Sequence, residues 1–439
     1  MKIKHLLGMA AVALMAAACS NDLNDVLAPE AAPQQEGYHF VATIAPKTFD
    51  ATTRAIVDNE DGTLSSKWKL DEEIALQYSQ TNIVNAKVTA VNDDGSATIE
   101  FMFTDENKPS DGTKVYFYYP AGSEKTAFLN SKLYKQDGTL CADRDLRSGA
   151  NTFKVNDDGI TLKDKVDLFP AMSIVKFSLQ DITGNTVSVN KMIISTSKYK
   201  YTITPTDASG TNSLYVTLHS LADATFWFEA TGTDGKPYIA KGTSKLKLGE
   251  FYQTTLKMAT VGNVIGSDGK YYENKAVAEA VDGVKARAMI AYLGTEAEGA
   301  AHGLAIALED ASSELVTWDN AATTVSTWSG GHAVPGGTWR LPSAYDWQRM
   351  FIGCYSTSTY VSELKSDNYQ MKFFCGNFLI NLEAASGESE EVNYYYWSST
   401  EYDSDNAWFY YFNNNEYDIN EFYYESKGNS NYVRAVLAF

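Results

Sequence analysis

The sequence predicts a mainly β protein, with antiparallel β-sandwich structure followed by a mixed α+β region. Between residues 38 and 258, short runs that alternate apolar and polar residues, such as Tyr38–Ile44, are separated by turn residues. Asp-Gly pairs recur between these runs, and glycine supplies the positive φ of tight hairpin turns. No helical period persists there beyond a turn or two. We therefore expect one β-sandwich, or two in series, over residues 38–258.

A different pattern begins near residue 261. The apolar run Ala286–Gly294 is typical of a buried strand, and a helix is predicted to begin after Ser343, a candidate N-cap residue. Apolar residues then follow at helical spacing, namely Trp347, Met350 and Phe351. We therefore expect strands and at least one helix over residues 261–439.

The N-terminus has the features of an export signal. Lys2 and Lys4 precede Leu6–Ala18, thirteen apolar or small residues that end at Cys19. As a helix this run reaches roughly 20 Å, short of the ~30 Å hydrocarbon core, so it predicts a cleaved signal over residues 1–18.

The residues around Cys19 indicate lipidation. Ala16–Cys19 resembles a lipobox, in which the cysteine thiol is acylated, although such motifs favour leucine where Ala16 stands. We predict a palmitate-bearing lipoprotein with a flexible tether over residues 19–37. An ordinary signal cleaved after Ala18 is the alternative.

The composition excludes several classes of partner and site. The chain of 439 residues carries a net charge of -19, and such a surface repels nucleic acid. The histidines stand alone, without the His or Cys spacing that zinc requires, so we expect no metal and no cofactor. Cys354 and Cys375 lie in one region of the sequence and could form a disulfide. The sequence does not give the distance between their Cα atoms, so both the paired and the unpaired state stay open.

Residues 38–258 resemble the fimbrillin family, the pilus subunits of Gram-negative anaerobes. The order of several short motifs carries this resemblance: Ala51–Ala55 (ATTRA), Trp68–Leu76 (WKLDEEIAL), Tyr116–Pro120 (YFYYP), Gln136–Leu140 (QDGTL) and Leu248–Lys257 (LGEFYQTTLK). The resemblance implies a two-lobed transthyretin-like sandwich with a boundary near residue 165. It also implies that a protease removes the first strand by cutting after an arginine, which matches Arg54 and Ala55. A strand from a neighbouring subunit then fills the opened groove.

Residues 262–439 resemble the C-type-lectin-like superfold, in the bacterial branch related to formylglycine-generating enzymes. The motifs are Trp339–Ser343 (WRLPS), Tyr396–Glu401 (YWSSTE) and Val433–Val436 (VRAV). The related enzymes need reactive cysteines late in the domain, yet none follows Cys375. Common hydrolase and nucleotide-binding signatures are absent too, so we expect a protein that is not an enzyme.

The last 49 residues are rich in groups that bind sugars. They contain 16 aromatic residues and eight acids, but neither of the motifs by which lectins of this fold hold calcium. Rings stack on sugar C–H faces, while carboxylates and amides bond to hydroxyls. Trp339, Trp397 and Trp408 are expected in the core. The candidate ligand-binding residues lie in two loops: Tyr402, Asp403, Asp405 and Asn406, then Asn414, Glu416, Tyr417 and Asp418.

These expectations combine into one functional hypothesis. The chain is predicted to be a lipid-anchored precursor at the outer membrane and cell surface that becomes a pilus subunit, a tip adhesin assembled by strand exchange. Its expected partners are other fimbrial subunits and a host or microbial surface glycan or protein. The tip position follows from Val433–Phe439, an apolar run expected inside the C-terminal core and therefore a poor donor strand. The alternative is a monomeric glycan-binding lipoprotein that captures polysaccharide.

Overall fold

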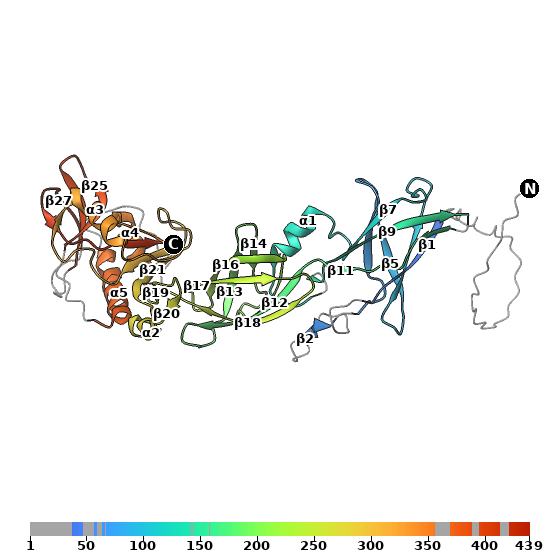
Figure 1. Ribbon diagram of the computed structural model, residues 1–439, viewed down its shortest axis with the longest axis horizontal. Coiled ribbons are helices and arrows are strands. Elements are labelled where there is room, and N and C mark those ends of the chain that lie inside the picture. The colour runs from blue at the N-terminus through green and yellow to red at the C-terminus, as the bar shows by residue number, and fades with distance from the viewer. Residues whose placement is uncertain are drawn as a thin grey trace, which may run out of the picture.

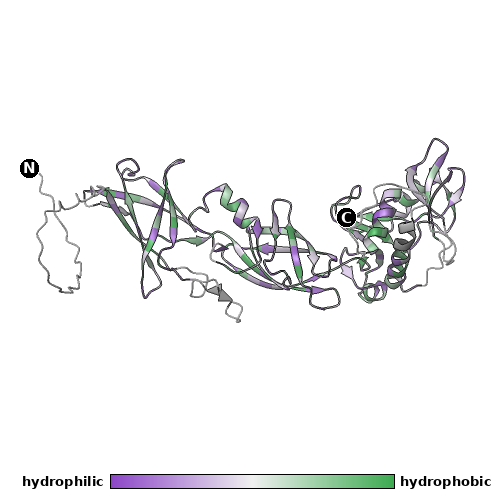
Figure 2. Cartoon of the chain, turned by 180° about the vertical axis from the view of Figure 1, so that it is seen from behind, coloured by the Kyte–Doolittle hydropathy of each residue, from purple (hydrophilic) through white to green (hydrophobic). Residues whose placement is uncertain are grey.

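The computed structural model describes residues 37–46, 57–58, 64–65, 67–141, 144–157, 159–355, 369–388, 395–412 and 421–439, and for 57–58, 64–65, 369–375 and 421 only the backbone. Three bodies follow one another along an elongated molecule: a first lobe at the N-terminal end, a second lobe, and a C-terminal domain (Figure 1). Strands make up most of the regular structure, which confirms the expected mainly β class. Apolar and polar residues alternate along the strands of both lobes (Figure 2).

The first lobe is one sheet that closes on itself. Its strand order is β10-β1-β6-β5-β4-β7-β9-β11, and β10 also pairs with β9. The interior is apolar and includes Phe40, Phe103 and Phe153. A two-stranded hairpin, β2 (Val57–Asp58) with β3 (Leu64–Ser65), lies outside this sheet. The strands of the sheet are β1 (Tyr38–Ile44), β4 (Glu73–Gln77), β5 (Ile83–Val91), β6 (Ala97–Phe103), β7 (Lys114–Tyr119), β9 (Arg147–Asn156), β10 (Gly159–Leu162) and β11 (Phe169–Pro170).

The second lobe packs two sheets face to face, in the orders β15-β12-β18 and β17-β16-β13-β14-β8, where β8 is Lys135–Gln136. Its strands are β12 (Ser173–Asp181), β13 (Val189–Ser195), β14 (Lys200–Ile203), β15 (Ser213–Leu218), β16 (Leu221–Gly232), β17 (Pro237–Leu246) and β18 (Phe251–Met258). Phe177 of one sheet meets Phe228 of the other, edge to face at 5.3 Å between ring centroids.

A boundary near residue 165 does not separate the two lobes cleanly. Strand β8 (Lys135–Gln136) joins β14 in the second lobe, and Leu133 lies in that lobe's core. Leu133 belongs to a short helical segment formed by α1 (Thr126–Phe128) and the π-helix η1 (Leu129–Leu133). The chain therefore enters the second lobe, returns to the first as β9, and then crosses again.

The strand pairing also departs from the expected antiparallel pattern. Three pairs of strands are parallel, namely β1–β10, β8–β14 and β12–β18.

The C-terminal domain combines three sheets with helices. The largest has the order β20-β19-β21-β22-β29-β24, and smaller ones pair β23 with β28 and β25-β26-β27. The elements are β19 (Val264–Gly266), β20 (Tyr271–Tyr272), α2 (Lys275–Glu279), β21 (Ala286–Leu293), β22 (Gly303–Ala307), β23 (Val316–Thr317), α3 (Trp318–Ser329), β24 (Thr338–Arg340), α4 (Ala344–Tyr355), α5 (Tyr369–Ser386), β25 (Tyr395–Glu401), β26 (Asn406–Tyr411), β27 (Glu421–Ser426), β28 (Ser430–Asn431) and β29 (Val436–Ala438). None of the described helices has the length and apolar character needed to cross a membrane.

Helix α4 confirms the predicted cap. The Asp346 backbone N–H donates to Ser343 Oγ at 3.0 Å, and the Ser343 N–H donates to Asp346 Oδ2 at 2.7 Å. This reciprocal arrangement gives a hydrogen-bond acceptor to two backbone N–H groups at the helix start that have no partner within the helix. Trp347, Met350 and Phe351 are buried as their spacing predicts.

The C-terminal strand lies inside the domain, as expected. Strand β29 pairs with β22 on one side and β24 on the other. Val436 and Leu437 are fully buried, and the backbone carbonyl of Phe439 accepts a hydrogen bond from Gly303 N at 3.0 Å. Withdrawing this strand would split the largest sheet of the domain.

Candidate functional site

Strand β1 completes the first lobe. It pairs antiparallel with β6 along its whole length, from Tyr38 opposite Phe103 to Ile44 opposite Ala97, and it meets β10 in parallel at Phe40. Phe40 and Ile44 are fully buried. The Phe40 ring packs edge to face on Phe103 at 5.9 Å and on Phe153 at 5.7 Å. Without β1, the apolar interior between β6 and β10 would be open.

Strand β1 ends on the side of the first lobe that faces the second lobe (Figure 1). The Ala45 N–H donates to Val166 O at 2.8 Å, and Trp68 Nε1 donates to Ala45 O at 3.0 Å. Strand β1 pairs in parallel with β10 at Phe40, and Ile44 forms a parallel bridge with Val166 further along the chain. Strand β1 therefore points toward β11, at the junction of the two lobes (Figure 1). The predicted cleavage pair, Arg54 and Ala55, follows this point and lies outside the described residues, as does Cys19.

The second lobe contains an apolar groove between two strand edges. At one end, Ile239 of β17 and Ala259 exchange two backbone hydrogen bonds of 2.7 Å. Beyond that bridge, β17 pairs with β16 and β18 pairs with β12, and among the described residues neither has a ladder partner on the groove side. The cavity between them has a volume of about 250 Å³.

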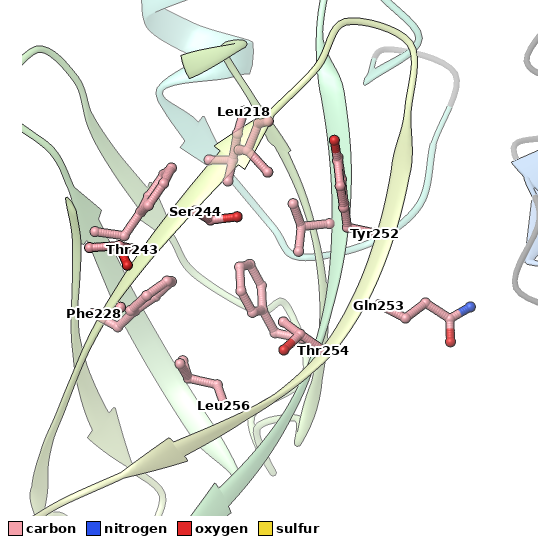
Figure 3. Close-up of a pocket in the computed structure, with 13 residues that line it drawn as sticks. Leu218, Phe228, Thr243, Ser244, Tyr252, Gln253, Thr254 and Leu256 are labelled. Carbon is pink, nitrogen blue, oxygen red and sulfur yellow. The ribbon is translucent and has the colours of Figure 1, made fainter. Parts of the chain in front are cut away.

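The lining of this groove suits an extended chain. Leu218, Phe228 and Leu256 point into the space, whereas Gln253 of β18 points away (Figure 3). Two free backbone edges above an apolar floor are the features that accept an added β-strand. Sequence reasoning missed this groove, because β17 and β18 are adjacent in the chain and would ordinarily be expected to pair along their length.

The turn between β25 and β26 holds the first group of predicted ligand-binding residues: Tyr402, Asp403, Asp405 and Asn406. Asp403 Oδ1 accepts hydrogen bonds from the backbone N–H groups of Asp405 at 2.9 Å and Asn406 at 2.8 Å. The Asn406 side chain also donates to Asp403, and this bond makes the largest contribution to lowering the pKa of that carboxyl group. The Asp403 carboxylate therefore shapes the turn.

The second group of predicted ligand-binding residues follows strand β26 in the sequence. Asn414, Glu416, Tyr417 and Asp418 are outside the described residues, but Tyr411 and Glu421, which flank them, pair with each other. From Asn406 to Tyr411 strand β26 extends about 17 Å, at about 3.3 Å per residue. The role of this second group in ligand binding therefore stays a prediction.

An aromatic cluster that sequence reasoning missed forms beside the first turn. The rings of Tyr402 and Tyr424 are parallel, 3.6 Å apart with an interplanar angle of 5°. Trp408 stands edge-on to both, at 5.3 Å and 5.7 Å. Of the three tryptophans expected in the core, Trp397 is fully buried, whereas Trp339 and Trp408 are half-buried. Only the pairing of β26 with β27 brings Tyr424 opposite Trp408.

The side chain of a basic residue from the turn after β27 contacts the turn between β25 and β26. Lys427 Nζ donates to Ser404 O at 3.0 Å, lies 3.4 Å from a Glu401 carboxylate oxygen, and sits over the Trp318 ring. The positive charge of the Lys427 side chain, held at this turn, repels a metal cation. No group of three or more His, Cys, Asp or Glu side chains in the described part of the chain is placed to hold a metal ion.

The proposed disulfide is not decided. Cys354 is buried in α4, and its Sγ lies 3.7 Å from the carbonyl oxygen of Ala291. The Cys375 side chain, on α5, is outside the described residues. Pairing of Cys354 with Cys375 stays a prediction.

Comparisons with known proteins gave structural neighbours only. No protein-family model matches the chain, and no curated protein matches it. Among solved structures, a fimbrial protein from Bacteroides ovatus is 14% identical, with a TM-score of 0.28, over 92% of this chain and 100% of that one. A fimbrial assembly protein from Parabacteroides distasonis is 11% identical, with a TM-score of 0.29, over 50% of this chain and 91% of that one.

Proposed function

We propose that this chain is a cell-surface fimbrial subunit that assembles by strand exchange and displays its C-terminal domain for adhesion. The observation that carries the proposal is the position of β1, which is a single strand inserted between β6 and β10 near the start of the chain. It can leave without unthreading any other element. The fimbrillin-like motifs and the lipobox at Cys19 support the same conclusion.

Cleavage between Arg54 and Ala55 would make β1 removable. Before cleavage, β1 is covalently joined to the rest of the first lobe through the chain that follows Pro46. After cleavage only its hydrogen bonds and the burial of Phe40 and Ile44 retain it. An incoming strand with apolar residues at alternate positions can replace these contacts one for one. Because β1 points toward the second lobe, a longer donor strand would continue toward the groove between β17 and β18.

The first test concerns maturation. In cells that assemble the fibre, Arg54→Ala is expected to prevent the cut and to keep surface material monomeric, while Cys19→Ala abolishes lipid labelling. The measurements are the N-terminal sequence of surface protein and the ladder of polymers on a denaturing gel. Arg147→Ala is unsuitable as a control because Arg147 is buried, so Lys67→Ala, at an exposed position, serves instead. Native protein that always begins at Cys19, remains monomeric and binds glycan would favour the alternative of a glycan-capturing lipoprotein.

We place the subunit at the tip because its C-terminal strand is a poor donor. β29 has neighbours on both sides, and Val436 and Leu437 are fully buried. Each large side chain loses about 1.5–3 kcal/mol of burial when withdrawn. The subunit can then accept a strand but does not supply one.

The second test concerns this position. Cross-linking mass spectrometry of assembled fibres is expected to join the β6 and β10 edges to another subunit, and β29 to none. Cross-links from the β29 strand into a neighbouring subunit's groove, or immunogold label spaced along the shaft, would show that the subunit is not confined to the tip.

A further inference from the structure

The aromatic cluster of Tyr402, Trp408 and Tyr424 has an open, rigid surface. The side chains of Tyr402 and Tyr424 are 46% and 49% exposed, although each covers one face of the other. About half of the surface of each tyrosine therefore remains in contact with solvent. Large aromatic side chains left this exposed on a rigid sheet are typical of contact surfaces.

Three separate contacts fix these rings before any ligand arrives. Trp408 and Tyr424 are direct partners across β26 and β27. The Tyr402 N–H donates to Asn406 O at 3.0 Å, which anchors the turn that carries Tyr402. The rings of Tyr402 and Tyr424 stack on each other, with 3.6 Å between their centroids. A surface held in this way loses little side-chain entropy on binding.

The charges around the cluster define the ligand. Three acidic residues surround the cluster: Glu401, Asp403 and Asp405, all exposed. The nearby Lys427 already contacts Ser404 O and Glu401, and its side chain is only 15% exposed. This negative rim disfavours sulfated or sialylated ligands. The oxygens of Asp403 are occupied by the turn itself, so a ligand bridged by a metal ion is disfavoured as well.

We propose that the aromatic cluster binds a neutral pyranose unit of a surface glycan by stacking of the sugar's C–H face on an exposed tyrosine ring, without a metal ion. The cluster matches the size of one sugar ring, whereas a specific protein partner requires roughly 800 Å² on each side. This inference rests on the proposed display role of the C-terminal domain and names the ligand that it would recognise.

The chain offers a matched pair of variants for the test. Tyr423 and Tyr424 are neighbours on β27 with exposures of 40% and 49%, and they point to opposite faces of the sheet because strand residues alternate. The full-length chain is titrated with neutral oligosaccharides of glucose, galactose and mannose, with sialyllactose as the anionic probe, by ligand-observed NMR. Wild type is expected to bind at least one neutral probe and to be unaffected by a chelator.

The variants then locate the site. Tyr424→Ala is expected to weaken binding at least tenfold, Tyr424→Phe to retain most of it, and Tyr423→Ala to leave it unchanged. The proposal would be overturned if Tyr423→Ala and Tyr424→Ala weakened binding equally, or if no neutral probe gave a response at millimolar concentration. It would also be overturned if binding needed calcium or if the protein preferred sialyllactose. Adhesion to a glycan-free protein surface that Tyr424→Ala abolishes would assign the cluster to a protein receptor and would also overturn it. Incorporation of Tyr424→Ala into fibres keeps this result separate from the assembly proposal.

Discussion

A chain that begins at Ala55, and so lacks β1, is expected to lose most of the stability of its first lobe. Phe40 and Ile44 alone bury enough apolar surface for roughly 3–6 kcal/mol, at about 1.5–3 kcal/mol each. The edges of β6 and β10 lose their hydrogen-bond partners at the same time. Denaturant unfolding should show a first-lobe transition at much lower denaturant than in the chain that retains β1.

Adding the missing strand as a peptide should reverse this loss. A synthetic peptide of residues 37–46 is expected to bind the shortened chain and to restore the transition. Two altered peptides test register: Phe40→Asp places a charge in the core and should fail, whereas Val41→Asp, at a position 39% exposed on the outer face, should still bind. Rescue by both peptides, or by neither, would contradict insertion of β1 between β6 and β10.

Loss of the Asp346 carboxylate is expected to destabilise the C-terminal domain strongly. Asp346 is fully buried, caps α4 through Ser343, and forms an ion pair with Arg340, whose Nη2 lies 2.8 Å from its Oδ1. The Arg340 side chain is 25% exposed, so water partly screens the ion pair, while loss of a helix cap alone costs about 0.5–2 kcal/mol. Asp346→Ala should therefore lower the free energy of unfolding of this domain by about 2 kcal/mol or more.

A control of the same residue type is available in α3. Asp319 also lies in the first turn of a helix but is exposed, so Asp319→Ala should cost less than about 1 kcal/mol. Six of the eight tryptophans follow residue 261, so intrinsic fluorescence reports mainly on this domain. Equal destabilisation by the two variants would show that the cap and the ion pair of Asp346 do not contribute as argued.

Local patterns predicted those features that depend on neighbouring residues in the chain. Alternation over Tyr38–Ile44 predicted a strand with one buried face, and the structure buries Phe40, Ala42 and Ile44. Ser343 predicted the start of α4, because capping involves residues only three positions apart. The apolar run near the C-terminus predicted an interior strand, and β29 is one.

Features that depend on distant pairing were not predictable in this way. Strand β8 belongs to the second lobe through Thr202 and Ile203 of β14, more than sixty residues later. Tyr424 lies opposite Trp408 because the register of β27 with β26, and not proximity in sequence, sets which side chains meet.

The sequence by itself determined the mainly β class, the positions of individual strands, the cap of α4 and the buried end of the chain, because side-chain period and capping are local properties. Only the tertiary structure decided that β1 closes the first lobe between β6 and β10, that β17 and β18 diverge around a groove, and that Tyr402 meets Tyr424. Each of these depends on which strands become neighbours. That choice is made by the burial of whole faces against one another, a sum over many residues that no short motif contains.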